Sequence, residues 1–250
     1  MPETKNILVT GVCGGIGRTL AEVFAEEGWR VIGTDQRKPD FPSDHFSFIQ
    51  HDLEKIADDD TSLGKLLEDV RKLIGPAPLQ ALINNGALQV LGGVDELSAH
   101  DFLQSFKVNT LAPFRLVQAL LPVLEKATAP TVLNIGSVHA QSTKEGFDAY
   151  ATTKTALHGL TRSMAVDLGN RVRICGLAPA ATDTPMLKAG FKNNPEAFQA
   201  LAEAHPLRRI ASTREVAEIA VFLVSGKAGF IHGETLYADG VVLSRLHDPL

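Results

Sequence analysis

Three residues in one short stretch of the sequence have the chemistry of a proton-transfer site. Tyr150 and Lys154 are four residues apart, so on a helix their side chains lie on one face, one turn apart. A tyrosine with its ordinary pKa of about 10 is a poor base at pH 7, but a neighbouring ammonium favours the phenolate. Ser137 precedes Tyr150 by thirteen residues and adds a hydroxyl. The pair also occurs by chance at this spacing, and ordinary helix residues are the alternative.

A glycine-rich turn follows the first apolar run of the chain. The sequence TGVCGGIG at 10–17 lies between a strand-like and a helix-like segment, which is the context that a dinucleotide-binding turn requires. Gly11 permits a tight turn, Gly15 lets the backbone approach a pyrophosphate, and Gly17 lets the helix pack close to the strand. The helix N-terminus then offers N–H groups to the phosphates. We interpret the turn as a phosphate-binding loop rather than an ordinary glycine-rich connection.

An acidic residue ends the second predicted strand. Asp35 comes 20 residues after Gly15, where a carboxylate can accept hydrogen bonds from both hydroxyls of an adenosine ribose. The same charge repels a 2′-phosphate, so we predict NAD rather than NADP. Arg37 and Lys38 follow closely. They either soften this discrimination or are solvated turn residues.

Short apolar runs alternate with amphipathic stretches along the whole chain. The runs are apolar on successive residues, as in strands that are covered on both faces. Strands that alternate with helices predict right-handed βαβ units and a parallel sheet. We therefore predict one α/β domain over residues 1–250. The predicted strands cover 6–10, 30–34, 46–50, 79–84, 131–136, 172–177 and 235–238, and the predicted helices cover 15–28, 61–74, 98–125, 150–168 and 213–225.

A long insertion separates the sixth predicted strand from the last predicted helix. Residues 185–210 are partly amphipathic, and their apolar side chains are available to cover a neighbouring surface. Long insertions in compact domains often form lids, so we predict a substrate lid at about 185–210, with a plain surface excursion as the alternative. The acidic run at 58–60 precedes Thr61, and we interpret it as a solvated turn with charge at a helix N-terminus rather than as a metal site.

Composition and charge exclude several classes of partner. The chain has 250 residues, 44% of them hydrophobic, and a net charge of −5, which favours neither nucleic acid nor an anionic membrane surface. We find no apolar run of about 18 residues, so we expect no transmembrane helix. The N-terminal residues enter a strand-like run directly, which argues against a signal peptide. Cys13 and Cys175 are the only cysteines and cannot build a disulfide framework, so we expect a cytoplasmic protein.

These motifs together resemble the short-chain dehydrogenase/reductase family in its form of about 250 residues. The resemblance covers essentially the whole chain and implies a doubly wound Rossmann fold, with a seven-stranded parallel sheet flanked by helices. It also implies hydride transfer between C4 of a nicotinamide and a carbinol or carbonyl carbon. The motifs, in the order of the family, are TGxxxGxG at 10–17, Asp52, NNGA at 84–87, Asn109 in VNTLAPF, Ser137, YxxxK at 150–154 and PAATDT at 179–184.

The resemblance implies roles for four catalytic residues. Tyr150 is the base, and Lys154 lowers its pKa and holds the hydroxyls of the nicotinamide ribose. Ser137 orients the substrate oxygen, and Asn109 interrupts a long helix and holds a water that relays protons to Lys154. The implied cofactor-binding residues are Gly11, Gly14, Gly15, Ile16, Gly17, Asp35, Asp52, Leu53, Asn85, Gly86, Tyr150, Lys154, Pro179, Thr182 and Thr184.

The sequence departs from the family's pattern at three places. Gly86-Ala87 stands where the family usually has Ala-Gly. Pro179-Ala180 stands where it usually has Pro-Gly, which strains the backbone by about 1 kcal/mol if residue 180 has a positive φ and is silent otherwise. Cys175 replaces a common asparagine. None of these changes touches the catalytic atoms, so we expect an active enzyme.

Position matching to the family indicates which residues contact the substrate. These are Ser137, His139, Gln141, Tyr150 and Met186. A lid with two phenylalanines amid lysines and asparagines favours a sugar, polyol or hydroxy acid over a steroid. Two alternatives stay open: an NAD(P)H-dependent reductase of an apolar ketone, and a non-catalytic dinucleotide-binding regulator. Family members are usually homotetramers or homodimers. Charges that an anionic substrate would use are Lys144, Lys188, Lys192, Arg208 and Arg209.

Overall fold

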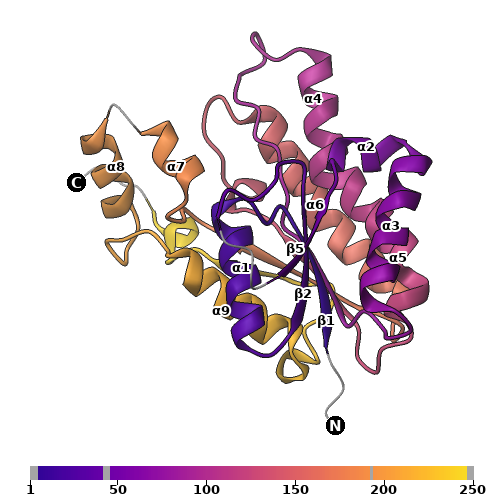
Figure 1. The fold of residues 1–250 in the computed structure, drawn as a ribbon. Coiled ribbons are helices and arrows are strands. Elements are labelled where there is room, and N and C mark those ends of the chain that lie inside the picture. The colour runs from indigo at the N-terminus through magenta and orange to yellow at the C-terminus, as the bar shows by residue number, and fades with distance from the viewer. Residues whose placement is uncertain (1–4, 42–45, 192–193, 247–250) are drawn as a thin grey trace.

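Seven parallel strands form one sheet through the centre of the molecule (Figure 1). The computed structural model describes residues 5–41, 46–191 and 194–246. The strand order β3-β2-β1-β4-β5-β6-β7 changes direction between β1 and β4, as in a doubly wound fold, and confirms the predicted sheet. The strands are β1 Asn6–Thr10, β2 Arg30–Asp35, β3 Phe46–Gln50, β4 Ala81–Asn84, β5 Thr131–Ile135, β6 Arg173–Pro179 and β7 Thr235–Ala238.

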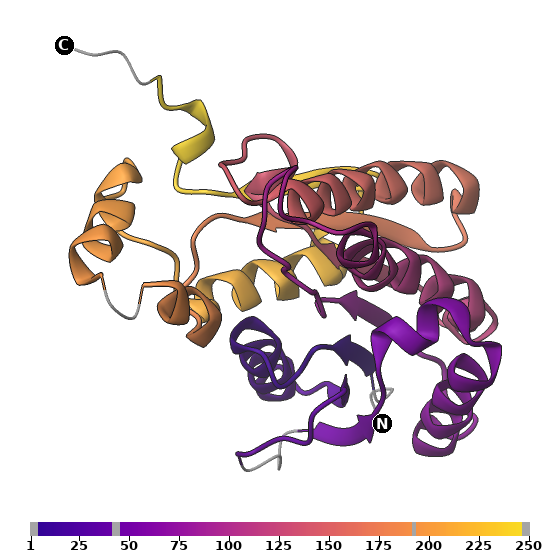
Figure 2. The same cartoon turned by 90° about the horizontal axis from the view of Figure 1, so that it is seen from above.

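Helices cover both faces of this sheet. On one face lie α1 (Gly15–Glu26) and α9 (Thr213–Val224), and on the other lie α3 (Asp60–Ile74), α5 (Ala112–Leu124) and α6 (Asp148–Leu168) (Figures 1 and 2). Successive residues of β1 serve the two layers, because Leu8 packs with α3 and α5 whereas Ile7 and Val9 pack with α1 and α9. A strand buried on both faces must be apolar throughout, which is why the sequence showed runs instead of alternation.

Polar residues determine where the helices begin. Asp52 accepts the N–H of Glu54 and caps α2 (Leu53–Asp58), a helix of six residues that is too short to show a periodic pattern in the sequence. Asp59 accepts the N–H of Thr61 and caps α3, so the acidic run does place charge at a helix N-terminus. The run is not a simple turn, however, because Asp58 is the last residue of α2.

The single helix predicted over 98–125 is divided by a π-helical segment. α4 (Ala99–Phe106) begins with a capping box between Ser98 and Asp101. The π segment covers Lys107–Leu111 and leads directly into α5. In a π-helix the backbone hydrogen bonds join residues five apart, which is rare and often marks a functional site. Asn109 lies at the centre of this segment.

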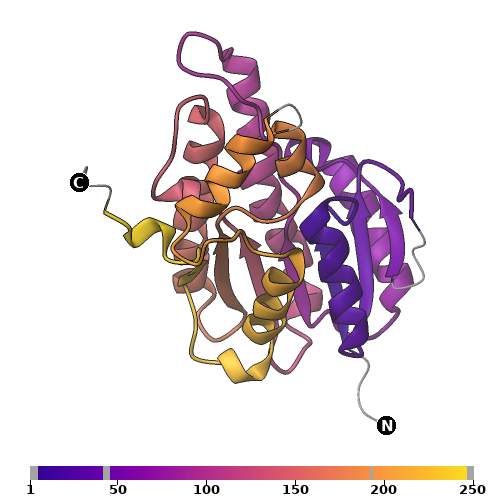
Figure 3. The ribbon, with the colours of Figure 1, turned by 90° about the vertical axis from the view of Figure 1, so that its left-hand side faces the viewer.

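The insertion at 185–210 forms two short helices beyond the carboxyl ends of the strands. α7 (Pro185–Gly190) and α8 (Pro195–Ala204) lie above α1 and α9 in Figure 3, and no residue of either helix, all of them described, is buried. Phe191 meets Phe198 edge to face at 5.7 Å between ring centroids, which joins the two helices. Single turns of 3-10 helix cover Val138–Ala140, Gly226–Ala228 and Val242–Ser244.

Candidate active site

Ser137, Tyr150 and Lys154 meet at the carboxyl end of β5. Ser137 follows this strand, while Tyr150 and Lys154 lie on one face of α6 with the lysine Nζ 5.7 Å from the centroid of the tyrosine ring. The Ser137 hydroxyl accepts the N–H of His139 at 3.1 Å, which fixes its position. Lys154 is 2% exposed, and its Nζ donates to the Ile135 carbonyl at 2.8 Å. The three side chains that the sequence grouped are therefore neighbours.

The chain's own groups do not lower the pKa of Tyr150. Burial raises this pKa above its ordinary value, and a side-chain hydrogen bond with Ser137 only partly opposes the rise. Burial also lowers the pKa of Lys154 to about 8. Sequence reasoning expected Lys154 and the nicotinamide charge together to favour the phenolate. In the structure the ammonium donates to the Ile135 carbonyl, and burial is the largest influence of the protein on the Tyr150 pKa.

Asn109 ties α6 to the segment that follows β4. Its Oδ1 accepts the N–H of Leu88 at 2.8 Å, and its Nδ2 donates to the Leu88 carbonyl at 2.8 Å and to Thr153 Oγ1 at 3.0 Å. The regular helical bonding is interrupted here, as expected. Both amide N–H groups are used, so the predicted proton relay needs an acceptor such as a carbonyl of the π segment. Sequence reasoning missed Thr153, although it stands between Tyr150 and Lys154 in YATTK.

The glycine turn is packed against the segment after β4. Gly11 has φ +72°, and a Cβ there would lie 2.6 Å from Gly86 Cα. A Cβ on Gly17 would lie 2.0 Å from the Gly11 carbonyl oxygen. Gly14 is the N-cap of α1, and Ile16 packs against the core. The backbone of the turn is thus tightly packed at the start of α1, the end of a helix that offers N–H groups to phosphates.

Gly15 has a neighbour that the sequence did not indicate. A Cβ at this position would lie 2.9 Å from Pro185 and 3.0 Å from Thr184, at the base of the predicted lid. Thr184 caps α7 by accepting the N–H of Leu187 at 3.1 Å. The glycine therefore lets the lid base approach the phosphate loop, and any pyrophosphate held by that loop would lie next to Thr184.

Asp35 is fixed beside the glycine turn. One carboxylate oxygen accepts the N–H of Cys13 and the other accepts the N–H of Arg37, each at 3.0 Å. Each oxygen keeps a second lone pair for a ribose hydroxyl. The guanidinium of Arg37 is exposed, lies 3.9 Å from the carboxylate, and contacts the Cys13 carbonyl at 3.4 Å. The carboxylate of Asp35 and the guanidinium of Arg37 are thus neighbours at the position where a 2′-phosphate would distinguish NADP from NAD.

The departure at NNGA is accommodated by Leu53. A Cβ on Gly86 would lie 2.5 Å from Leu53 Cδ1, so the leucine occupies the space that a methyl group would take. Asn85 Nδ2 donates to the carbonyls of Thr10 and Gly11 at 2.9 and 3.2 Å, and the N–H groups of Asn85 and Gly86 donate to Thr10 Oγ1. Thr10 is a further residue that the sequence analysis missed, since a threonine ending a strand gave no distinct signal.

The departure at Pro179-Ala180 is silent. The only described residues other than glycine with a positive φ are Arg208 and Val241, so Ala180 is not strained. Pro179 ends β6, and the Ala180 N–H donates to the Ala238 carbonyl. Thr182 donates to the Ala180 carbonyl and is buried. Cys175 is fully buried in the core and lies outside the site.

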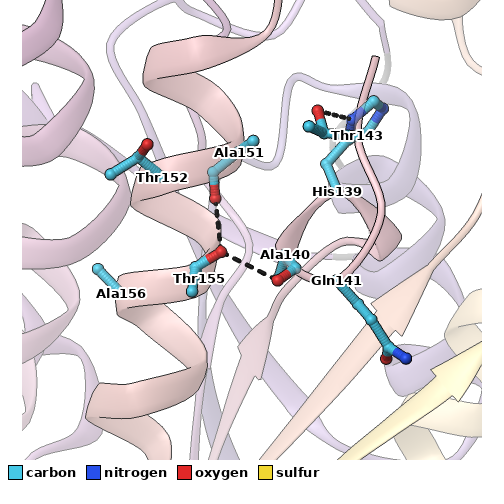
Figure 4. Close-up of a pocket in the computed structure, with 8 residues that line it drawn as sticks. All are labelled: His139, Ala140, Gln141, Thr143, Ala151, Thr152, Thr155 and Ala156. Atoms are coloured by element: carbon cyan, nitrogen blue, oxygen red, sulfur yellow. Dashed lines mark hydrogen bonds between the residues drawn. The ribbon is translucent and has the colours of Figure 1, made fainter.

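An aromatic wall stands beside Tyr150. The His139 ring stacks on Phe147 with centroids 4.4 Å apart, and both rings meet Tyr150 edge to face. Burial and Lys144 lower the pKa of His139 to about 4, so the imidazole is neutral at pH 7. Its Nδ1 lies 3.0 Å from Thr143 Oγ1 (Figure 4). Met186, also predicted to contact substrate, is 61% exposed.

Most of the candidate anion-binding charges are already engaged. Lys188 pairs with Asp183 and Arg209 with Glu215. Lys144 lies over the Phe147 ring. Arg208 is exposed and pairs with no acidic residue in the described ranges, and Lys192 lies outside them. The charges give little support to an anionic substrate.

A depression of about 520 Å³ lies on the outer side of this wall. Figure 4 shows it between α6 and the segment after β5. It includes His139 and Gln141 but none of the four catalytic candidates, and of these two predicted substrate residues only His139 also contacts the ring of Tyr150. Its lining residues are His139, Ala140, Gln141, Thr143, Ala151, Thr152, Thr155 and Ala156.

Comparisons with known proteins identify the family of this chain. A family model described as Enoyl-(Acyl carrier protein) reductase matches residues 11–240. The chain belongs to the short-chain dehydrogenase/reductase family of oxidoreductases, whose members bind nicotinamide cofactors. It is 30% identical to an uncharacterized oxidoreductase of Schizosaccharomyces pombe, over 97% of this chain and 92% of that protein. It is 28% identical to L-xylulose reductase of Bos taurus, over 96% and 97% of the two chains.

A solved structure shows how close the fold is. The ligand-free aldohexose dehydrogenase of Thermoplasma acidophilum matches with a TM-score of 0.91 at 28% identity, over 99% of this chain and 98% of that one. Within the described ranges, no helix has the length and apolar character needed to cross a membrane. In the same ranges, no group of three or more acidic, histidine or cysteine side chains is placed to hold a metal ion.

Proposed function

We propose that the chain is an NAD-dependent oxidoreductase that transfers a hydride between the nicotinamide and a secondary alcohol or carbonyl. The observation that carries this proposal is the meeting of Ser137, Tyr150 and Lys154 at the carboxyl end of β5, the same edge of the sheet at which the glycine turn follows β1. A regulator that only binds a dinucleotide has no use for a base held beside an ammonium. That alternative is therefore disfavoured.

The residues present fit a dinucleotide. Gly11, Gly14, Gly15, Ile16 and Gly17 form the turn at the start of α1, whose backbone N–H groups would hold the phosphates. Asp35 would hold the adenosine ribose, with Asp52, Leu53, Asn85 and Gly86 around the adenosine. Pro179, Thr182 and Thr184 would border the nicotinamide end and the phosphates. The bound cofactor supplies the hydride acceptor and, when oxidised, a positive ring charge.

The chain's own residues handle the proton. Ser137 donates to the substrate oxygen and orients it, and Tyr150 takes the hydroxyl proton as the hydride leaves. Lys154 has two N–H groups beyond the one bonded to Ile135, and these would bind the nicotinamide ribose. Since protein burial alone raises the pKa of Tyr150, the positive charge of the oxidised ring is needed to favour the phenolate.

We propose a sugar, polyol or hydroxy acid as the substrate class, with an uncharged sugar or polyol favoured. A neutral His139 beside Tyr150 offers hydrogen bonds, while most nearby cations are engaged. Two relatives carry names of this class, aldohexose dehydrogenase and L-xylulose reductase. The aromatic wall of His139, Phe147 and Tyr150 instead favours reduction of an apolar ketone, which is the second candidate.

We also propose assembly into a homotetramer or homodimer through the faces of α4, α5 and α6. Large apolar side chains are exposed on these helices, including Leu103, Phe114 and Val166, which is 86% exposed. Light scattering on the purified chain tests this directly, and a monomer would contradict it. The cytoplasmic location stays a prediction, based on two cysteines that are both free in the structure.

The function is tested by following NADH and NADPH formation with sugars, polyols and hydroxy acids, and their consumption with apolar ketones. We expect oxidation of at least one sugar or polyol with NAD. Turnover restricted to ketones with NADPH would support the second candidate. NAD binding without any turnover would support the regulator and contradict the proposal.

A further inference from the structure

A second buried polar pair lies one helical turn beyond Lys154. His158 follows Lys154 by four residues on α6, on the side away from Tyr150, and is 6% exposed. Its Nδ1 lies 3.4 Å from the phenolic oxygen of Tyr237 on β7. The two rings meet edge to face with centroids 5.9 Å apart. Because His158 is buried and Tyr237 is partly exposed, the pair extends from the buried side of α6 to the surface of the molecule.

His158 is fitted against the end of β5. A Cβ on Gly136 would lie 2.1 Å from His158 Nε2, so a larger residue at 136 would displace the imidazole. Gly136 lies between Ile135, whose carbonyl accepts the Lys154 hydrogen bond, and Ser137. The ring therefore packs against the short piece of backbone that positions two of the catalytic candidates.

The imidazole fills this space without adding charge. Burial, Lys154 and Arg162 lower the pKa of His158 to about 4. Its Nε2 is buried and has no hydrogen-bond partner among the described residues, which is unusual for a polar atom. The groups that face the ring are Lys154 and Arg162 on α6 and Tyr237 on β7, and Tyr237 in turn is close to Glu234. A protonated ring would repel both cations.

We propose that His158 and Tyr237 form a seal that keeps water from the side of Lys154 facing away from Tyr150, an inference that rests on the proposed function of Lys154. Burial is the cause that lowers the pKa of Lys154 to about 8. The same exclusion of water reduces screening, so the ammonium acts more strongly on the nearby phenol. His158 is thus a positioning residue that acts through Lys154.

The seal can be tested without turnover by titrating Lys154 directly. NMR of isotopically labelled lysine side chains, with the signal assigned by its loss in Lys154→Arg, should show titration near pH 8 in the unaltered chain. His158→Ala admits water, so the Lys154 pKa should rise toward its ordinary value of 10.5. Ser163→Ala, on an exposed part of α6, should leave it unchanged. An unchanged Lys154 pKa in folded His158→Ala would overturn the proposal.

A pair of variants tests the fit against β5 if His158→Ala is poorly folded. Gly136→Ala should lower the Tm of the unaltered chain, because its methyl group meets the imidazole. The same change in the His158→Ala background should lower the Tm much less, since the methyl group then enters vacated space. Equal losses of Tm in the two backgrounds would contradict the packing on which the seal depends. Tyr237→Phe keeps the ring and should shift the Lys154 pKa less than His158→Ala does.

Kinetics separate this inference from the proposed function. The acid limb of kcat/KM for alcohol oxidation should shift by about one pH unit in His158→Ala, because the variant changes both the charge state of Lys154 and the screening of that charge from the phenol. If Tyr150→Phe abolishes turnover but His158→Ala changes neither this limb nor the Lys154 pKa, the seal is wrong and the function stands. If the unaltered chain turns over no substrate, the function is wrong, and the NMR titration still decides the seal.

Discussion

The glycine turn and the predicted lid, which consists of α7 and α8, differ in how closely their backbones are packed. Around the turn, a Cβ on Gly17 would lie 2.0 Å from the Gly11 carbonyl oxygen. In the lid, a Cβ on Gly190 would meet nothing within 4 Å, and neither helix, all residues of both being described, has a buried residue. Close backbone approach admits one residue type, whereas an exposed surface admits many. Residue types and their spacing therefore predict the cofactor-binding region from the sequence, but they do not predict the substrate-binding region.

The largest expected effect is that of removing the base. Tyr150→Phe keeps the ring against Phe147 and Lys154, so NAD affinity should stay within a few-fold of the original value. Turnover should fall by at least about two orders of magnitude, since no group replaces the lost base. Binding titration and steady-state rates measure the two quantities separately. Retained turnover would remove Tyr150 from the mechanism.

A matched pair of glycine substitutions tests the contrast in packing. Gly17→Ala should destabilise the chain by about 1–3 kcal/mol and weaken cofactor binding, because its methyl group overlaps the Gly11 carbonyl. Gly190→Ala should leave both unchanged or raise stability slightly. Urea unfolding and NADH fluorescence report the two effects. Equal losses of unfolding free energy in Gly17→Ala and Gly190→Ala would show that the predicted lid is packed as tightly as the turn.

Asp35 tests how the cofactor end discriminates. Asp35→Asn removes the charge that repels a 2′-phosphate and leaves exposed Arg37 beside it. The preference for NADH over NADPH, measured as a ratio of Kd values, should fall by about tenfold or more, or at least about 1.4 kcal/mol. Asp40→Asn removes the same charge from an exposed position nearby and is the control. A lower Kd for NADP than for NAD in the unaltered chain would contradict the role of Asp35.

The smallest expected effect lies in the lid. Met186 is 61% exposed, so Met186→Ala should change KM by no more than about twofold, as for most surface substitutions. Substrate saturation curves measure this change. A tenfold rise in KM would show that the lid closes on the substrate, and the contrast between the two regions would then hold only for the free protein.

The sequence predicted most of the fold because its signals were local. All seven strands are found, and Asn109 lies where the long helix is interrupted, since apolar runs and motif spacing carry that information. The six-residue α2 gave no periodic signal. The contacts of Gly15 with Thr184 and of Gly86 with Leu53 join segments far apart in sequence, so spacing alone could not reveal them.

His158 is a residue that the sequence analysis did not single out. It continues the four-residue spacing of Tyr150 and Lys154, and that spacing could have placed it on the same face. Its fit against Gly136 and its contact with Tyr237 depend on how α6 packs on β5 and β7. The direction of the Tyr150 pKa shift was also beyond sequence reasoning, because it depends on burial and on the hydrogen bond with Ser137.

The pH dependence of kcat/KM for alcohol oxidation tests the central claim most directly. Oxidation requires the deprotonated phenol, so the rate should rise as pH passes through the pKa of Tyr150 in the presence of NAD. We predict a midpoint well below the ordinary value of about 10, although burial alone raises this pKa. We also predict that this limb is lost from the residual activity of Tyr150→Phe. A midpoint at or above 10, or the same limb in Tyr150→Phe, would contradict the account.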